Sequence, residues 1–172
     1  MKFFLSIFTI FLLYAISANS EQNLAFIDMD RIILTSIPGS SLSKQLDFIN
    51  NKNLTFLKKE GKKFKEKEKK VISQKNILSE TDFEIKVNEL KSQIKIYNQN
   101  RNKMISDFNK SKVDNTNKLL KLINPIIVEF ASNNKISIIL QKKNLVMGAT
   151  DQDITDEIIK IINSKVEKFN IK

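Results

Sequence analysis

Apolar residues recur at regular steps through the middle of the chain and predict a pair of long helices. In the later part the steps are mostly four and three residues, interrupted at Arg101, and the positions are Phe83, Val87, Leu90, Ile94, Tyr97, Met104 and Phe108. In the earlier part the repeat is every seven residues, at Leu57, Phe64, Val71 and Leu78. Sustained heptads are typical of a coiled coil, whereas polar companion positions such as Glu68 and Lys75 indicate a thin seam. We therefore predict a helical hairpin arm over residues 41–134.

The tip of this arm is expected where the chain has its one good turn signal. Ser, Glu, Thr and Asp follow one another at residues 79–82. Thr81 and Glu84 match a capping box, in which each side chain bonds the backbone N–H of the other residue. The second arm helix is therefore expected over about residues 82–133.

Short apolar runs on either side of the arm predict strands. The first run covers residues 24–27, and two more cover residues 136–140 and 145–147. The polar segment between the last two, residues 141–144, is long enough for a hairpin turn. A sheet of three strands leaves two edges with unpaired backbone groups, so we expect the chain to self-associate.

Helix ends outside the seam are marked by Asp and Pro residues. A short helix over residues 31–34, with an Asp cap, is expected to stop at residues 37–39, where Pro follows Ile. Pro125 either kinks the second arm helix or stands at the first position of a new helix capped by Asn124. A last helix, capped by Asp153, is predicted from a stripe formed by Ile154, Ile158, Ile161, Ile162, Val166 and Phe169.

The N-terminus has the layout of a secretory signal peptide. Lys2 precedes an uncharged, mainly apolar stretch at residues 3–16, and small polar residues follow at 17–20. The apolar stretch is short for a membrane span, which needs about 20 residues. We expect cleavage after residue 20 and an exported, soluble mature chain. An uncut, anchored protein is the alternative.

Composition argues against an enzyme. The 172 residues include no Cys and no His, and only three Gly. This removes thiol nucleophiles, the usual general base and the commonest metal ligands. The Asp residues of the flanking segments lack the spacing and the Gly of a calcium loop, so we interpret them as caps and turns: Asp28, Asp30, Asp151, Asp153 and Asp156. We predict no catalytic, cofactor-binding or metal-binding residues.

Charge divides the chain into two parts. The net charge is +10, and the arm accounts for +9 of it, with 20 basic and 11 acidic residues. Residues 21–40 and 135–172 are neutral and richer in apolar residues, so we interpret them together as a small association body. The arm carries a dense lysine cluster: Lys58, Lys59, Lys62, Lys63, Lys65, Lys67, Lys69 and Lys70.

Two interpretations of this lysine cluster stay open. It either attracts acidic or anionic partners over a distance, or is simply a solvated helix face. Nucleic acid is not an expected partner, because the cluster lacks the interleaved aromatic residues and Arg forks of such sites. Export would also separate the protein from nucleic acid.

The order of elements resembles the Skp/OmpH family of periplasmic chaperones. Three segments carry the resemblance: residues 24–34 (LAFIDMDRIIL) with Gly39 after them, 136–140 (ISIIL) and 153–158 (DITDEI). The resemblance implies an α+β, mainly α fold, in which a long helical-hairpin arm stands on a small β-rich trimerisation body with a C-terminal helix. It carries over no catalytic residues and no individual client-binding residue.

The resemblance also implies a function. Such proteins are ATP-independent holdases of the periplasm that hold unfolded outer-membrane proteins in a cavity between the arms of a homotrimer. We expect the lysine cluster to contribute to client binding, and the association body to use Phe26, Ile27, Ile136, Ile138, Leu140 and Val146. Contact with an anionic membrane surface or lipopolysaccharide is left open. The alternative is a secreted coiled-coil structural or adaptor protein that binds one specific partner.

Overall fold

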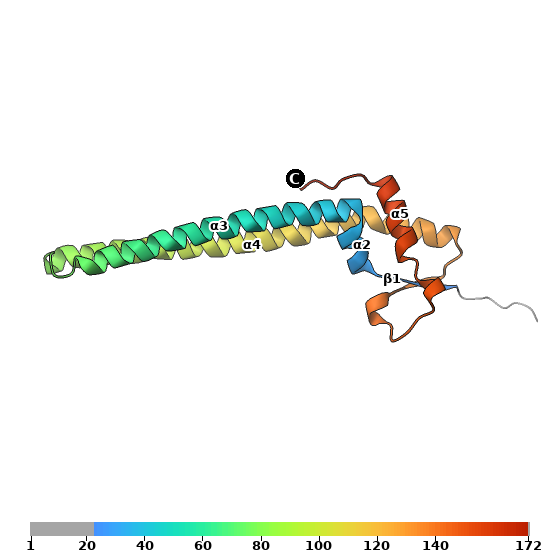
Figure 1. Cartoon of the computed structure of the whole chain (residues 1–172), viewed down its shortest axis with the longest axis horizontal. Coiled ribbons are helices and arrows are strands. Elements are labelled where there is room, and N and C mark those ends of the chain that lie inside the picture. The colour runs from blue at the N-terminus through green and yellow to red at the C-terminus, as the bar shows by residue number, and fades with distance from the viewer. Residues whose placement is uncertain (1–22, 172) are drawn as a thin grey trace, which may run out of the picture.

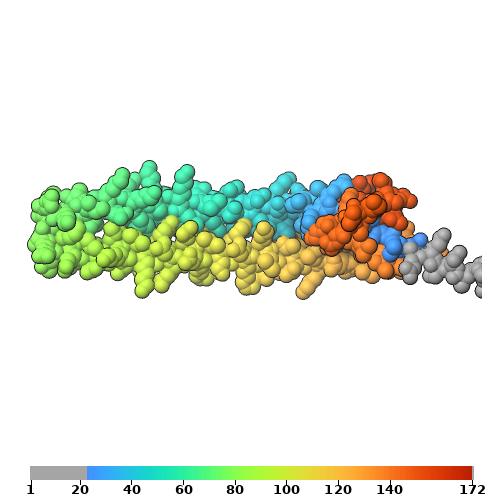
Figure 2. Space-filling view, turned by 90° about the horizontal axis from the view of Figure 1, so that it is seen from below, coloured from blue at the N-terminus to red at the C-terminus, as the bar shows by residue number. Residues whose placement is uncertain are grey.

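The computed structural model describes residues 23–171, so the predicted signal peptide lies outside the described residues. A long helical hairpin projects from a small end that contains both strands and the last helix (Figure 1). The prediction of a mainly helical α+β fold with such an arm is confirmed. The hairpin remains slender when the molecule is turned by 90° (Figure 2).

The arm consists of α3 (Ile37–Ser73) and α4 (Glu80–Asn133). At 1.5 Å per residue these helices are about 55 and 80 Å long. The predicted seam lies between them and is only half-buried over most of its length. Its best-packed pair is Phe64 and Tyr97, whose ring centroids are 5.1 Å apart. The Tyr97 hydroxyl also donates a hydrogen bond to the carbonyl oxygen of Leu57, at 3.1 Å.

The turn at the tip lies slightly earlier than expected, at residues 74–79, because a different residue caps α4. The Ser79 hydroxyl oxygen accepts the backbone N–H of Asp82 at 3.1 Å, so the predicted capping box of Thr81 and Glu84 is wrong. Ser79 meets the same requirement two residues earlier, since it leaves Glu80 and Asp82 in the first turn, where the helix dipole favours acidic side chains.

α4 continues unbroken past Pro125, so no new helix begins at Asn124. Proline lacks an N–H and deprives the carbonyl of Lys121, four residues earlier, of its helical donor. Both Pro125 and Lys121 are exposed, so water can reach this carbonyl.

The two strands pair in parallel rather than as part of a hairpin. β1 (Leu24–Ile27) lies beside β2 (Ile138–Gln141), with Leu24 opposite Ile138. Parallel strands need a long crossover connection, and here the whole arm provides it. The arm thereby begins and ends at one small sheet.

The predicted third strand at 145–147 is wrong. Residues 142–144 form a short 3₁₀ helix, and the following segment crosses over the ring of Phe26. Gly148 approaches this ring so closely that a Cβ atom there would lie 2.5 Å from Phe26 Cε1. Val146 is fully exposed, so its side chain has nothing to pack against within the described chain.

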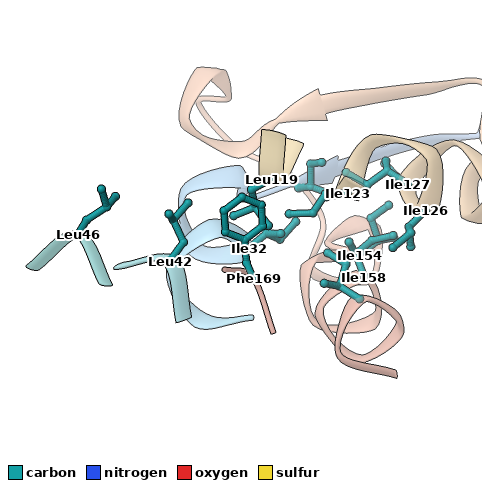
Figure 3. Close-up of a cluster of buried hydrophobic side chains, with 13 residues drawn as sticks. Ile32, Leu42, Leu46, Leu119, Ile123, Ile126, Ile127, Ile154, Ile158 and Phe169 are labelled. Atoms are coloured by element: carbon teal, nitrogen blue, oxygen red, sulfur yellow. The ribbon is translucent and has the colours of Figure 1, made fainter. Parts of the chain in front are cut away.

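The hydrophobic core lies where the arm meets the small end. Isoleucine and leucine side chains converge there from α2 (Met29–Thr35), the start of α3, the end of β1, the last part of α4, and α5 (Thr155–Lys165) (Figure 3). α5 ends earlier than its predicted apolar stripe, so Val166 and Phe169 follow the helix rather than belong to it. Phe169 nevertheless reaches the core from an extended tail.

The cap predictions at the small end are partly confirmed. Asp28 caps α2, accepting the backbone N–H of Arg31 at 2.9 Å. The expected stop at residues 37–39 is instead the first turn of α3, which Ser36 caps and where Pro is tolerated. Asp153 stands one position before the N-cap of α5, Ile154, and still accepts the backbone N–H of Thr155 at 3.1 Å.

Candidate functional site

The lysine cluster lies in the half of α3 that is nearer the tip of the arm. All eight lysines are exposed, and they point in many directions around the helix rather than forming one flat patch. Lys63 pairs with Glu60 at 2.7 Å, and Lys67 donates a hydrogen bond to Gln93 of α4 at 2.8 Å. The Lys67 ammonium also lies 5.3 Å from the centre of the Phe64 ring. The cluster therefore borders the seam without being buried in it.

An apolar groove of about 260 Å³ opens between α3 and α4 beside this cluster. Its floor consists of seam residues, namely Leu57, Phe64, Tyr97 and Met104. Its outer walls are Phe56 and Ile96, which remain 49% and 56% exposed. Exposure of such large apolar side chains to water is unfavourable, and covering them lowers the free energy. The groove can therefore accept an apolar group from another molecule.

Polar residues form the rim of the groove. Glu60 and Arg101 carry opposite charges there, and Gln93 and Asn100 add amide groups that can donate and accept hydrogen bonds. This mixture of apolar walls and a polar rim suits an extended polypeptide, which combines apolar side chains with backbone amides.

The sequence pattern did not identify Phe56 and Ile96 as groove walls. Each residue directly precedes a seam residue, Leu57 or Tyr97, and so falls outside the heptad positions. The sequence signal that could have identified them is a pair of adjacent apolar residues on each helix, Phe56 with Leu57 and Ile96 with Tyr97. Which doublets meet depends on how far the hairpin turn shifts one helix along the other.

The residues predicted for association divide into two sets. Phe26 and Ile27 are buried within the chain, and Ile136 packs against the core. These residues support the body from within. The other three are exposed: Ile138 at 46%, Leu140 at 41% and Val146 completely.

Two members of the exposed set, Ile138 and Leu140, lie on one face of the small sheet. Ile138 and Leu140 alternate along β2 and so point to the same side, and Leu24 is the partner of Ile138 on β1. Met147, next to Val146, is also exposed. Leu24, Ile138 and Leu140 thus give an apolar face that the described chain covers only in part, whereas Phe26, opposite Leu140, is buried against the segment at Gly148.

A polar network fixes the elements that carry this sheet. The Asp153 carboxylate accepts hydrogen bonds from Lys142 Nζ at 2.6 Å and from the Thr155 hydroxyl at 2.5 Å. Thr155 Oγ1 in turn accepts the backbone N–H of Asp28 at 3.0 Å. Nearby, Arg31 pairs with Asp156 at 2.5 Å. Asp28 and Asp153 therefore accept hydrogen bonds at helix starts, as predicted, whereas Asp156 forms an ion pair, and Asp153 joins the end of β2 to the start of α5.

Because of this network, we expect the free energy of unfolding to fall at acidic pH. Burial raises the pKa of Asp153, but the hydrogen bonds from Lys142 and Thr155 outweigh it and hold the pKa below its ordinary value of 3.8. A lowered folded-state pKa means that the ionised carboxylate stabilises the fold above the unfolded-state pKa. That contribution is lost as the pH falls through the folded-state pKa.

Asp153→Asn should therefore lower the free energy of unfolding at pH 7 by about 1–2 kcal/mol. The difference from the wild type should narrow below about pH 4, as the wild-type carboxylate also becomes neutral. Urea unfolding across this pH range measures both effects, and Asp151→Asn, at an exposed neighbour, is the control. An equal difference at every pH would contradict the assigned role of the charge.

The described residues contain no group of three Cys, His, Asp or Glu side chains that could hold a metal ion. Within the same part of the chain, none of the helices has the length and apolar character needed to cross a membrane.

Comparison with known proteins places the chain in a family. Residues 23–162 match the family described as outer membrane protein (OmpH-like), so the chain belongs to this family and the predicted resemblance is confirmed. The curated proteins include no match.

The fold is also similar to a crystal structure from Caulobacter crescentus CB15, solved at 2.83 Å and described as an OmpH-like outer membrane chaperone. The TM-score is 0.78 at 13% sequence identity, and the match covers 89% of this chain and 90% of that one. At this identity the match shows a shared fold.

Proposed function

We propose that this protein is an ATP-independent holdase of the periplasm that binds unfolded outer-membrane proteins and prevents their aggregation. The observation that carries the proposal is the exposed apolar groove of the arm, bordered by the lysine cluster. Phe56 and Ile96 line the same groove and are each about half exposed to water, which a rigid spacer does not require. Membership of the OmpH-like family supports the same function.

The mechanism combines long-range attraction with weak apolar contact. Net positive arms raise the local concentration of acidic clients, and the effect weakens as salt screens it. Apolar side chains of an unfolded barrel strand then occupy grooves such as that at Phe56 and Ile96. Many weak contacts together hold the client, but each one breaks easily. Release therefore needs no energy from nucleotide hydrolysis.

We further propose that three chains assemble through the body, residues 21–40 and 135–172. The apolar face at Leu24, Ile138 and Leu140, together with Val146, supports an interface of this kind. Assembly would place three arms around a shared space. The family resemblance is the source of the number three.

A direct test is suppression of aggregation. A urea-unfolded outer-membrane barrel protein is diluted into buffer with and without the mature protein, in the absence of nucleotide, and light scattering is followed. We expect suppression at a ratio of about one trimer per client, and similar suppression for a second, unrelated barrel protein. Protection of one client alone would favour the adaptor function, and protection of neither would contradict the holdase proposal.

The contribution of the lysine cluster is tested by removing four of its charges. Replacing Lys62, Lys63, Lys69 and Lys70 with Gln should slow association with an unfolded acidic barrel protein by about fivefold at low salt, because steering acts on the encounter rate. Gln and Lys have similar helix propensities, so the arm itself should remain intact. Stopped-flow fluorescence at several salt concentrations measures the rate.

The control removes the same number of charges elsewhere, at the exposed residues Lys44, Lys118, Lys160 and Lys168. This variant should slow association less, and the deficit of the cluster variant should shrink as salt rises. Equal rates for the cluster variant and the wild type at all salt concentrations would show that the lysines are a solvated helix face.

A further inference from the structure

The last residues of the chain lie along the base of the arm. After α5 ends at Lys165, residues 166–171 contain no helix or strand and run back beside the start of α3 (Figure 1). Ile158 and Ile162, both fully buried, anchor α5 in the core, and Lys165 at its end pairs with Glu129 of α4 at 2.5 Å. The tail can therefore leave α3 without moving the helix before it.

One glutamine holds the backbone of this tail. Gln45 Nε2 donates to the carbonyl oxygen of Phe169 at 2.6 Å, and Gln45 Oε1 accepts the backbone N–H of Ile171 at 3.0 Å. The Ser41 hydroxyl donates to the same Phe169 carbonyl at 3.0 Å. All three bonds use backbone groups of the tail, so they do not depend on its side chains.

Phe169 is the one buried side chain of the tail, and Val166 and Ile171 add half-buried contacts with the core. The ring of Phe169 is buried in the core cluster, beside Leu42 and Leu119 (Figure 3). Its neighbours Lys168 and Asn170 are exposed. The arrangement is a pocket for one large apolar side chain next to a clamp for backbone groups two residues apart.

We propose that Ser41, Gln45 and the pocket of Phe169 form a binding site for an extended peptide segment with a large apolar side chain, and that the chain's own tail occupies this site until such a segment replaces it. The inference rests on the proposed holdase function, since an unfolded client supplies both free backbone groups and exposed apolar side chains. The tail, tethered at Lys165, is a competitor at an effective concentration in the millimolar range. It therefore masks the site from weak ligands and yields to a client that is held nearby by the arms.

The test uses the full mature protein and a fluorescein-labelled peptide with the sequence of residues 164–171, SKVEKFNI. Phe169→Ala removes the anchor of the tail and leaves the site intact, whereas Gln45→Ala loosens the tail and damages the site. Amide exchange should quicken over residues 166–171 in both variants. Fluorescence anisotropy should show that Phe169→Ala binds the peptide at least about tenfold more tightly than the wild type or Gln45→Ala does.

The peptide should also refill the cavity left by Phe169→Ala. Its addition should raise the melting temperature of that variant, and should leave the melting temperature of Gln45→Ala unchanged. A peptide in which the phenylalanine is replaced by alanine should have neither effect. Failure of a folded Phe169→Ala variant to bind the peptide would overturn the proposal, as would binding of the peptide by Gln45→Ala as tightly as by Phe169→Ala.

A second variant covers the case in which Phe169→Ala does not fold. Ile171→Pro removes the N–H that donates to Gln45 Oε1, together with the half-buried contact of the Ile171 side chain, while keeping the Phe169 ring in its pocket. We expect at least about a fivefold gain in peptide binding, since one hydrogen bond alone has about this value, and no gain for the control Asn170→Ala. If neither Phe169→Ala nor Ile171→Pro gains peptide binding, the masking role of the tail is contradicted.

Aggregation assays on the same proteins separate this inference from the holdase proposal. Suppression of aggregation by the wild type without peptide binding by Phe169→Ala would overturn the tail site and leave the holdase function intact. Peptide binding by Phe169→Ala without suppression of aggregation by any form would support the tail site and contradict the holdase function.

Discussion

Replacing Ile138 with Asp should convert the assembled protein into folded monomers. Ile138 is 46% exposed in the single chain and lies on the apolar face of the sheet, so the carboxylate is tolerated while the chain is alone. In an assembled body the same carboxylate would be buried without a partner, at a cost of several kcal/mol for each chain. Sedimentation at micromolar concentration should show a trimer for the wild type and a monomer for the variant.

The control for this experiment is Ile72→Asp. Ile72 is also an exposed isoleucine, but it lies near the tip of the arm, away from the sheet. It should leave the trimer intact, and far-UV circular dichroism should show equal helix content in all three proteins. A folded wild-type monomer, or a trimer that survives Ile138→Asp, would contradict association through this face.

Replacing Gly39 with Ala should cause the largest loss of stability among alanine substitutions at the three glycines. A Cβ atom at Gly39 would lie 1.8 Å from the carbonyl oxygen of Ile33 and 2.7 Å from its carbonyl carbon. Both atoms are backbone, so α2 and α3 must separate to make room. The neighbouring Ser36, whose hydroxyl caps α3, is completely buried and would move with them.

We expect this change to lower the free energy of unfolding by about 3 kcal/mol, near the upper end of overpacking costs. For a chain of this size the melting temperature should fall by about 10 °C. Since assembly makes melting depend on concentration, all proteins must be compared at one concentration.

Gly61 offers the same substitution on the same helix as a control. Its Cβ would meet only the Tyr97 hydroxyl oxygen, at 3.4 Å, and alanine is favoured over glycine within a helix by about 1 kcal/mol. Gly61→Ala should therefore be neutral or slightly stabilising. Equal losses for the two variants would show that the contact of α2 with α3 is not tight at Gly39.

The sequence predicted the arm well because the arm depends on local periodicity. The seam positions from Phe83 to Phe108 recur within one helix and need no knowledge of the rest of the chain. The small sheet was predicted less well, because strand pairing joins residues more than a hundred positions apart. The runs at 136–140 and 145–147 fit a hairpin locally, yet β2 pairs with β1, and Gly148 instead packs over Phe26.

Helical spacing also explains the error at the C-terminus. Val166 and Phe169 continue the apolar stripe of Ile158 and Ile162, so the pattern extended the helix through them. In the structure α5 stops at Lys165, and Phe169 reaches the core from an extended segment. The competing interaction is the clamp of Gln45 on α3, a polar residue that no apolar pattern reveals.

The proposed client groove shows a similar limit. Leu57 and Tyr97 were predicted as seam residues, but the groove depends on Phe56 and Ile96 lying on the same side of the hairpin. That outcome depends on the length of the turn at residues 74–79, which sets the axial alignment of the two helices. The lysine cluster, in contrast, was visible at once, although its position around α3 was not.

We propose that an assembly of three chains holds one unfolded outer-membrane protein. Native mass spectrometry of the exported protein, alone and with a denatured barrel protein, tests this most directly. We expect the mass of the mature chain without residues 1–20, a trimer in the absence of client, and a complex of three chains with one client in its presence. A client bound to single chains, or a trimer that binds no client, would contradict it.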